Sequence, residues 1–544
     1  MIIPKMQQLV RMAMVFILGG LIAACSGGER ETDIAASEGI LLIGNGTEPK
    51  GLDPHLVTGV PENHIISALI EGLIAYHPTD DLIPSPGVAE SWESNDDYTV
   101  WTFKLRDDAM WTNGDPVVAG DFAYSWQRML SPALGSEYAP MLYVIKGAEP
   151  FHAGRTEDFS TVGVRVLDDK TLEVTLEGPT PFFLNMLKHY SFFPVNPRVV
   201  EEHGGMTDRQ SGWSTVENYV GNGAFTLKSW ETNQLIEVES NPDYWDAETV
   251  QLNGIRFFPI ENASTEETMY RSGRLHLTSI VPVDKIPSLR ESAPDELMIE
   301  PYLGSYFYRV NVTRPPFDNP KVREALAVSF DKQLLVDKVT KGGQSAATGF
   351  VPEGIPGYEA STKVQYDPEL GKKLLAEAGY PDGEGFPSAE ILINTSEAHR
   401  KVAEAMQAMW KENLGIDVGI YNQEWKVYLD SQSNLDYDLS RSGWIGDYVH
   451  PSTFLELFTT GNGNNDTGWA NAEYDALIAQ AQVAQTEEAR TQALQSAEEI
   501  LLTELPVLPI YWYTRVYMKD PQVRGWNPKV LDNHPYKSIY FEAN

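Results

Sequence analysis

The hydrophobic residues in the first half of this 544-residue chain follow a pattern typical of strands. Short apolar or alternating segments predict strands at 39–45, 98–106, 164–166, 172–176, 224–229 and 235–240, the last four as two hairpins. Apolar residues recur at helical spacing over 62–76 and 121–130. The first half is therefore expected to consist mainly of strands and hairpins with a few helices.

Beyond about Tyr302 the apolar residues recur mostly at helical spacing. They predict helices at 321–341, 368–378 and 472–503, and a βαβ-like unit at 389–394, 398–413 and 416–421. A last strand is expected at 507–518, and hairpin-like sequence returns near Thr514. The chain has no internal repeat of fixed period. This order predicts an α/β protein of more than one domain.

The segment Arg441–Tyr448 carries the most unusual mixture of chemistry. A short strand is expected at 435–442, so Asp447 lies just past a strand end, where open α/β sheets bind ligands. Gly443 leaves bare backbone and Trp444 offers a flat wall. An aspartate among such neighbours is costly to bury unless a cation meets it. Asp447 is thus either an anchor for a positive ligand group or an acidic turn residue in water, and these eight residues alone favour the second.

The N-terminus has the pattern of a secretory signal peptide. Lys5 and Arg11 precede an apolar run of 13 residues, 12–24, which is too short for the roughly 20 residues that cross a bilayer. The run ends in Leu-Ile-Ala-Ala-Cys, which resembles the lipobox of bacterial lipoproteins, and Cys25 is the only cysteine. We therefore expect a signal peptide at 1–24, lipidation of Cys25 and a flexible tether at 25–39.

Composition narrows the range of functions. The 520 residues that follow the predicted signal suggest about three domains. The net charge of −36 disfavours binding to nucleic acid and to anionic lipid. The sequence has no paired histidines or cysteines at metal-ligand spacing, no nucleophile elbow and no phosphate loop. We accordingly expect no cofactor, no metal and no catalytic residue, and this absence weakly favours a binding role.

Aromatic residues are abundant, with 13 Trp, 25 Tyr and 20 Phe. Most are expected to be core residues. Tyr302, Trp425 and Tyr513 stand near the proposed domain transitions, where aromatic side chains are a natural lining for a ligand between domains.

A family resemblance extends from about residue 40 to the C-terminus. The chain resembles the solute-binding proteins of oligopeptide ABC transporters, the family 5 extracellular solute-binding proteins. The resemblance is dense and collinear, and it is carried by Pro-Gly-Val-Ala-Glu-Ser-Trp-Glu at 86–93, Val-Trp-Thr-Phe-Lys-Leu-Arg at 100–106, Asp-Phe-x-Tyr-Ser-Trp-Gln-Arg at 121–128, Asn-Gln-Glu-Trp at 422–425 and Gly-Trp-x-x-Asp-Tyr at 443–448.

The resemblance implies a two-lobed periplasmic binding protein of type II, in the large dipeptide and oligopeptide class. An additional domain is expected, with the ligand enclosed between the lobes. In this chain lobe I would comprise 40–70, 197–302 and 515–544, the extra domain 71–196, and lobe III 303–514.

The resemblance also implies site roles and partners. Asp447 would pair with the α-ammonium of a bound peptide, and Arg441 and His399 would meet its C-terminal carboxylate. Peptide backbone would pair with the strand edge near Gly443, and the wall positions would be Val60, Tyr138, Tyr302, Trp425 and Trp444. The implied partners are short peptides, an ABC permease and ATPase subunits. The protein would be a monomer of the periplasm or cell envelope, held by lipid.

Two departures from close relatives affect the pocket. Ser279-Ile280-Val281 replaces a common Tyr-Asn-Asn stretch, and Thr340 occupies a cationic position with Lys341 one step away. Peptide length and side-chain preference therefore stay open. Other solutes also stay open, namely a murein peptide, an opine, a nickel chelate or an oligosaccharide. A sensor or chaperone without a transporter is a further alternative, and a secreted hydrolase using paired carboxylates is the least favoured.

Overall fold

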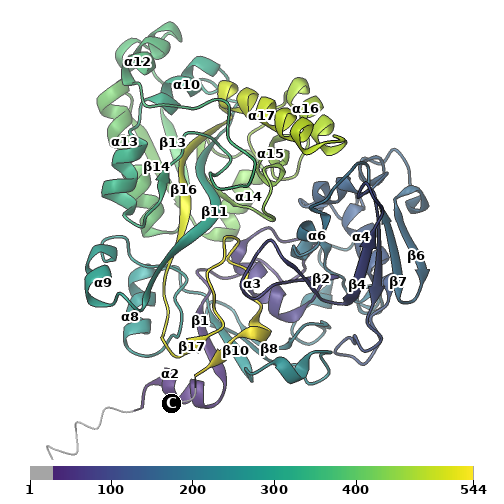
Figure 1. Cartoon of the computed structure of the whole chain (residues 1–544). Coiled ribbons are helices and arrows are strands. Elements are labelled where there is room, and N and C mark those ends of the chain that lie inside the picture. Colours follow the sequence, from purple (N-terminus) through teal and green to yellow (C-terminus); the bar gives the residue numbers. More distant parts are fainter. Residues whose placement is uncertain (1–28, 543–544) are drawn as a thin grey trace, which may run out of the picture.

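The computed structural model describes residues 29–542 of the chain. Three main β-sheets, each with its own helices, lie in three parts of an α/β molecule (Figure 1). We call these parts lobe I, the extra domain and lobe III.

Lobe I is built on a four-stranded sheet in the order β1-β10-β9-β8. Its strands are β1 (Ile40–Gly44), β8 (Phe225–Glu231), β9 (Leu235–Ser240) and β10 (Gly254–Phe258), and β1 runs parallel to β10. Around it lie α2 (Glu31–Ser37), α3 (Val60–Leu69), α8 (Ala263–Arg271), α9 (Ile286–Ser292), β17 (Val523–Arg524) and β18 (Tyr540–Phe541). Segments from both ends of the chain thus share one lobe.

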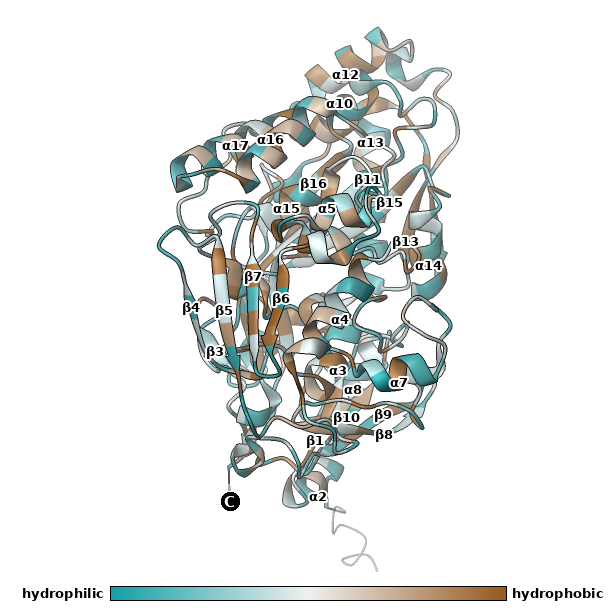
Figure 2. Cartoon of the chain, turned by 90° about the vertical axis from the view of Figure 1, so that its right-hand side faces the viewer, coloured by the Kyte–Doolittle hydropathy of each residue, from teal (hydrophilic) through white to brown (hydrophobic). Residues whose placement is uncertain are grey.

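The extra domain carries an antiparallel sheet in the order β4-β5-β7-β6, which is visible in Figure 2. Alternation buries Trp101, Phe103 and Leu105 on one face, as the sequence predicts. The elements are β2 (Ile74–Tyr76), β3 (Pro84–Pro86), β4 (Ala89–Ser94), β5 (Val100–Leu105), α4 (Ala119–Leu130), α5 (Ala148–His152), β6 (Val164–Asp168), β7 (Thr171–Thr175), α6 (Phe183–Met186) and α7 (Pro197–Glu202). A buried bidentate pair between Arg128 and Asp53 joins this domain to lobe I.

Lobe III contains a six-stranded mixed sheet in the order β12-β16-β11-β15-β13-β14. Its strands are β11 (Leu297–Val310), β12 (Ser345–Ala346), β13 (Ala389–Asn394), β14 (Val418–Gln423), β15 (Leu439–Ile445) and β16 (Val507–Met518). Its helices are α10 (Pro320–Val328), α11 (Lys332–Leu335), α12 (Pro368–Glu377), α13 (Glu397–Leu414), α14 (Trp425–Ser433), α15 (Ser452–Leu455), α16 (Ala472–Gln482) and α17 (Glu487–Glu504). The predicted βαβ unit is β13-α13-β14, whose strands pair in parallel.

Two long strands connect lobe III with lobe I. β11 and β16 pair antiparallel, and both extend from the six-stranded sheet toward α8 and α9 (Figure 1). Their register shifts between the pairs Pro301–Thr514 and Ser305–Trp512, which leaves Tyr302 and Tyr513 inside an interrupted stretch of the ladder. The predicted domain boundary at 302/303 falls in this stretch, and the one at 514/515 lies just outside it, where Thr514 and Arg515 pair with Pro301 and Glu300.

The expected tether at 25–39 is wrong for its later part. Helix α2 occupies 31–37 and packs on lobe I, with Thr32 and Ala35 buried. The Thr32 N–H donates to the carbonyl of Gly273, and the Thr32 carbonyl lies 3.0 Å from Nε2 of His276. Small polar composition suggested a flexible segment, but a few buried contacts fix a short helix. Residues 1–28, which include the predicted signal peptide and Cys25, lie outside the described residues.

Three predicted helices are shorter than expected. The segment 62–76 leaves the helix after Leu69, and Ile74–Tyr76 forms β2. The helix predicted at 321–341 ends at Val328 and restarts after Asp331, whose carboxylate accepts from the N–H of Leu334. The helix predicted at 472–503 breaks before Thr486, whose hydroxyl caps α17. In the last two cases a capping side chain inside an apolar-periodic segment begins a new helix.

Candidate functional site

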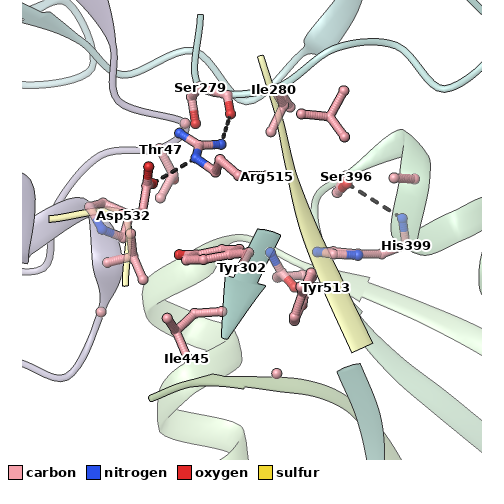
Figure 3. A pocket seen from close by; sticks show the side chains of 18 of the residues that line it. Thr47, Ser279, Ile280, Tyr302, Ser396, His399, Ile445, Tyr513, Arg515 and Asp532 are labelled. Atoms are coloured by element: carbon pink, nitrogen blue, oxygen red, sulfur yellow. Dashed lines mark hydrogen bonds and ion pairs between the residues drawn. The ribbon is translucent and has the colours of Figure 1, made fainter. Parts of the chain in front are cut away.

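A cavity of about 430 Å³ lies between lobe III on one side and lobe I with the extra domain on the other. This volume is typical of small-molecule and short-peptide sites. The cavity is lined by all ten predicted site residues, Val60, Tyr138, Tyr302, His399, Trp425, Arg441, Gly443, Trp444, Asp447 and Tyr513. Figure 3 shows part of this lining.

Asp447 follows the end of β15 by two residues and is 8% exposed. Its carboxylate accepts hydrogen bonds from the hydroxyls of Tyr138, at 3.2 Å, and Thr453, at 3.0 Å. Nε2 of His189 lies 3.2 Å from the same carboxylate. Because Nδ1 of His189 accepts from the N–H of Ser191, Nε2 carries the proton and donates to Asp447. Two of these donors belong to the extra domain.

The charge of Asp447 is not balanced by the protein. Burial raises the pKa of this carboxyl from its ordinary 3.8 to about 7. Burial also lowers the pKa of His189 to about 3, so the imidazole is neutral. Within residues 29–542 no lysine or arginine lies within 4.0 Å of the Asp447 carboxylate. The carboxylate of Asp447 can therefore pair with one positively charged group of a ligand.

Arg441 on β15 is, among the described residues, a cation without an anionic partner, just as Asp447 is an anion without a cationic one. Its guanidinium donates to the Tyr513 hydroxyl, at 2.8 Å, and to Oδ1 of Asn394, at 3.3 Å, and it lies over the ring of Tyr306. Its Nε is buried without a hydrogen-bond partner. In the described part of the chain no carboxylate forms an ion pair with Arg441. A partly buried guanidinium that has no ionic partner and one spare donor is suited to a carboxylate.

His399 lies in the first turn of α13 (Figure 3). Its Nδ1 is 3.3 Å from the hydroxyl of Tyr306. Burial, and then the charge of Arg441, hold the pKa of His399 well below its usual value. The imidazole is neutral and is available as a hydrogen-bonding group rather than as a second cation.

One edge of β15 faces the cavity. The Arg441 carbonyl accepts from Tyr428 and Gln432 on α14, whereas the Gly446 N–H donates to Leu303 at the end of the β11 ladder. Backbone groups of successive strand residues point to opposite edges. The N–H and carbonyl of Gly443 therefore point away from β11, beyond the last β13 pairing at Ser440. This edge can pair with an extended ligand backbone.

Aromatic side chains form much of the wall. The Trp444 ring lies 6.0 Å from that of Tyr138, and the rings of Tyr302 and Tyr513 lie 5.9 Å apart. The indole N–H groups of Trp444 and Trp425 are buried and have no partner among the described residues. Unpaired donors of this kind are costly unless a ligand acceptor meets them. Val60, at the start of α3, is 36% exposed.

A buried ionic cluster in the wall was missed by the sequence analysis. Nε of Arg515 donates to Asp532, at 2.6 Å, and its Nη1 donates to the Ser279 carbonyl (Figure 3). His534 lies 3.0 Å from the same carboxylate. Burial alone would raise the pKa of Asp532, but the charge of Arg515 and then the contact with His534 bring it below its ordinary value. The cluster is self-balanced, so it shapes the wall without demanding a charged ligand.

Thr340 lines the cavity, whereas Lys341 turns to the rim. There its Nζ lies 4.0 Å from Asp284 of lobe I, and Lys401 of lobe III also pairs with Asp284. The described residues contain no group of three or more His, Cys, Asp or Glu placed to hold a metal ion. None of their helices is both long and apolar enough to cross a bilayer.

Comparison with known proteins identifies the class. The family model "Bacterial extracellular solute-binding proteins, family 5 Middle" matches residues 84–466. The chain belongs to this family, and its fold is that of a two-lobed type II binding protein. It is 36% identical over 537 residues to the periplasmic oligopeptide-binding protein OppA of Salmonella typhimurium, covering 96% of this chain and 97% of that protein.

Solved structures agree with this assignment. The complex of Haemophilus influenzae OppA with RPPGFSPFR matches with a TM-score of 0.88 and 36% identity, covering 93% of this chain and 99% of that one. The Escherichia coli murein tripeptide binding protein MppA matches at 0.87 in one structure but at 0.62 in its unliganded open form, with 35% identity, 92–93% of this chain and 98% of MppA covered in both. The lobes of this chain are therefore not arranged as in the open form.

Proposed function

We propose that the protein captures short peptides for an ABC importer and delivers them to the membrane permease without changing them chemically. The observation that carries this proposal is the charge pattern of one cavity. A buried carboxylate, Asp447, lacks a cation, and a partly buried guanidinium, Arg441, lacks an anion. Between them the Gly443 edge is open to backbone pairing. A short peptide with free termini can pair its ammonium with Asp447, its carboxylate with Arg441 and its backbone with the strand edge at Gly443.

The binding step follows from this geometry. The peptide α-ammonium would take the place of the proton on Asp447 and form a charge-assisted hydrogen bond in a dry site. Peptide N–H and carbonyl groups would pair with Gly443, and the C-terminal carboxylate would meet Arg441 with His399 beside it. Main-chain pairing does not depend on side chains, so it supports broad tolerance of sequence.

Closure would be a hinge motion of the two lobes. Tyr138 and His189 come from the extra domain and Asp447 from lobe III, so the anchor is complete only when the lobes are together. A ligand that contacts both sides stabilises the closed form. The closed form would then dock on a permease whose ATPase subunits supply the energy, since the sequence contains no phosphate loop.

Calorimetry with a tripeptide tests the proposal. Tri-alanine should bind, and N-acetyl-tri-alanine should bind at least a hundredfold more weakly. Asp447→Ala should weaken tri-alanine binding by about 3–5 kcal/mol, the range expected when one partner of a buried ion pair is removed. Asp436→Ala is the matched control, because Asp436 is an exposed carboxylate outside the cavity. Equal affinity for the free and the acetylated peptide would refute the assignment of Asp447.

We further propose that the protein is a monomer held at the membrane of the cell envelope by lipid on Cys25. The lipobox-like Leu-Ile-Ala-Ala-Cys sequence supports this proposal. Intact-mass measurement of protein from membranes should show a lipid adduct and loss of residues 1–24, and Cys25→Ala should abolish both. Unmodified Cys25 in the mature protein would contradict the proposal.

A further inference from the structure

One wall of the cavity is aliphatic. Ile280, Val283 and Val516 are partly exposed and line the cavity, and Val281 and Ile286 lie buried behind them at 6% and 2% exposure. We call these five residues the aliphatic wall. All of them except Ile280 form part of a hydrophobic cluster in lobe I that also includes residues of α8 and α9. The nearest acid in sequence, Asp284, is exposed and is paired with Lys401 at the rim.

The backbone at the start of the aliphatic wall is already satisfied. The N–H groups of Ser279 and Ile280 donate to the carboxylate of Glu266, at 2.6 and 3.2 Å. The Ser279 carbonyl accepts from Arg515. This stretch therefore turns its hydrogen-bonding groups away from the cavity and presents side-chain methyl groups to it.

Glu266 has this position because Gly44 leaves space for it. Glu266 is fully buried, and a Cβ on Gly44 would overlap with its Oε1. Gly44 is the last residue of β1, so the carboxylate is fixed between the lobe I sheet and the wall segment. Gly44 and Glu266 thus hold Ile280 against the cavity, although neither residue belongs to the aliphatic wall.

From these contacts we propose that the aliphatic wall is a side-chain subsite selective for aliphatic groups, with Glu266 as a positioning residue. The inference rests on the proposed function and specifies which peptides the cavity prefers. An aliphatic side chain placed there leaves water for methyl groups, which is favourable. The methyl groups of the aliphatic wall offer no partner to a lysine or glutamate side chain, which would lose hydration against them, and this is unfavourable.

The proposal is tested with tri-alanine as the reference. Calorimetry would compare peptides that carry a single leucine, lysine or glutamate at position one, two or three. At one of the three positions, the peptide that carries leucine should bind at least tenfold more tightly than the peptides that carry lysine or glutamate there. At the positions away from the wall, the three substitutions should differ by less than about threefold.

Variants assign the preference to the wall. Ile280→Asn and Val283→Asn should remove most of the leucine preference at that one position. Glu266→Gln should reduce the same preference, since the amide keeps one acceptor but cannot accept from both N–H groups as the carboxylate does. Val166→Asn is the matched control, because Val166 is a partly exposed valine on β6 that does not line the cavity. Melting temperatures establish that each variant is folded.

The outcomes separate the two proposals. Failure of tri-alanine and all its derivatives to bind would overturn the proposed function. Binding of every peptide with similar affinity would leave peptide capture standing and overturn the aliphatic subsite. A leucine preference that survives both Ile280→Asn and Val283→Asn would also overturn it.

Discussion

The hydroxyl of Tyr513 lies 2.5 Å from the place where a Cβ on Gly443 would be. The same hydroxyl accepts a hydrogen bond from Arg441, two residues before Gly443 on β15. The absence of a side chain at Gly443 thus allows Tyr513 to orient the guanidinium, and it also leaves the strand edge open to the cavity.

Gly443→Ala should therefore weaken peptide binding. The added methyl group would displace the Tyr513 ring from Arg441 or project over the strand edge, and we expect a loss of about 1.5–3 kcal/mol, which is roughly 10- to 100-fold in Kd. Calorimetry with tri-alanine measures the effect. Gly120→Ala is the control, because a Cβ there meets only Val118, at 3.9 Å. An unchanged Kd for Gly443→Ala would show that neither the ring position nor the strand edge matters for binding.

Amidation of the peptide C-terminus should weaken binding by about 10- to 100-fold, because the amide cannot neutralise the partly buried guanidinium of Arg441. Arg441→Met should remove most of this difference between acid and amide. A double-mutant cycle over peptide and protein, measured by calorimetry, isolates the coupling. A coupling energy near zero would mean that the C-terminal carboxylate of the peptide does not contact Arg441.

The empty protein should close more readily at low pH. In the closed form burial raises the pKa of Asp447 from 3.8 to about 7, so this form binds more protons than an open one with a solvated carboxyl. The stabilisation is complete below about pH 4 and is lost as pH rises to about 7, by about 1.4 kcal/mol per unit. Small-angle scattering of the ligand-free protein should show compaction between pH 8 and pH 6.5, above the range in which protonation of a solvated His189, whose pKa burial lowers from 6.5 to about 3, would oppose closure.

Two variants test the source of this pH dependence. Asp447→Asn mimics the protonated group and should be compact at both pH values. Tyr138, His189 and Glu456 also face Asp447, and burial raises the pKa of Glu456 to about 7 as well, so Glu456→Gln is the needed companion. If Asp447→Asn still became more compact between pH 8 and pH 6.5, as the unsubstituted protein does, another group would be responsible for the effect.

Asp284→Ala should loosen the closed form only slightly. Its two lysine partners, Lys401 and Lys341, bridge from lobe III to lobe I across the rim, but all three groups are partly or fully exposed. Surface pairs of this kind contribute about 0–1 kcal/mol. We expect a two- to fivefold faster peptide release in stopped-flow measurements, and the difference should vanish at high salt. A hundredfold effect would mean that Asp284 acts inside the cavity.

Local pattern predicted much of the fold. The last strand was predicted at 507–518, where β16 lies, and both hairpins and the βαβ unit formed where alternation and helical spacing indicated. Asp447 follows a strand end because the apolar segment before it is a strand. These features depend on neighbours in sequence. The helix errors at Leu69, Val328 and Gln482 arose where an apolar period continued across a change of structure.

The missing parts of the site depend on distant contacts. Tyr138 and Asp447 are 309 residues apart, and the resemblance paired them with the ligand rather than with each other. His189 and Glu266 carry no local signal, because their importance comes from what the fold places beside them. The contact between Thr453 and Asp447 is the most local of these, because the two residues are only six positions apart in the sequence. The volume of the cavity and the position of the aliphatic wall depend on how distant segments pack together, which local sequence pattern does not predict.

The interrupted ladder between β11 and β16 has a mechanical consequence. Strands that lack regular pairing can bend without breaking hydrogen bonds, so in the proposed closure Tyr302 and Tyr513 would lie at the hinge, whereas the ion pair of Asp284 and Lys401 joins the two lobes at the rim. A small rotation at this hinge would therefore displace the rim of the cavity by a larger distance. A peptide that contacts Tyr302 and Tyr513 would then lie beside this hinge and would link lobe III to the extra domain through Asp447, which also accepts a hydrogen bond from Tyr138.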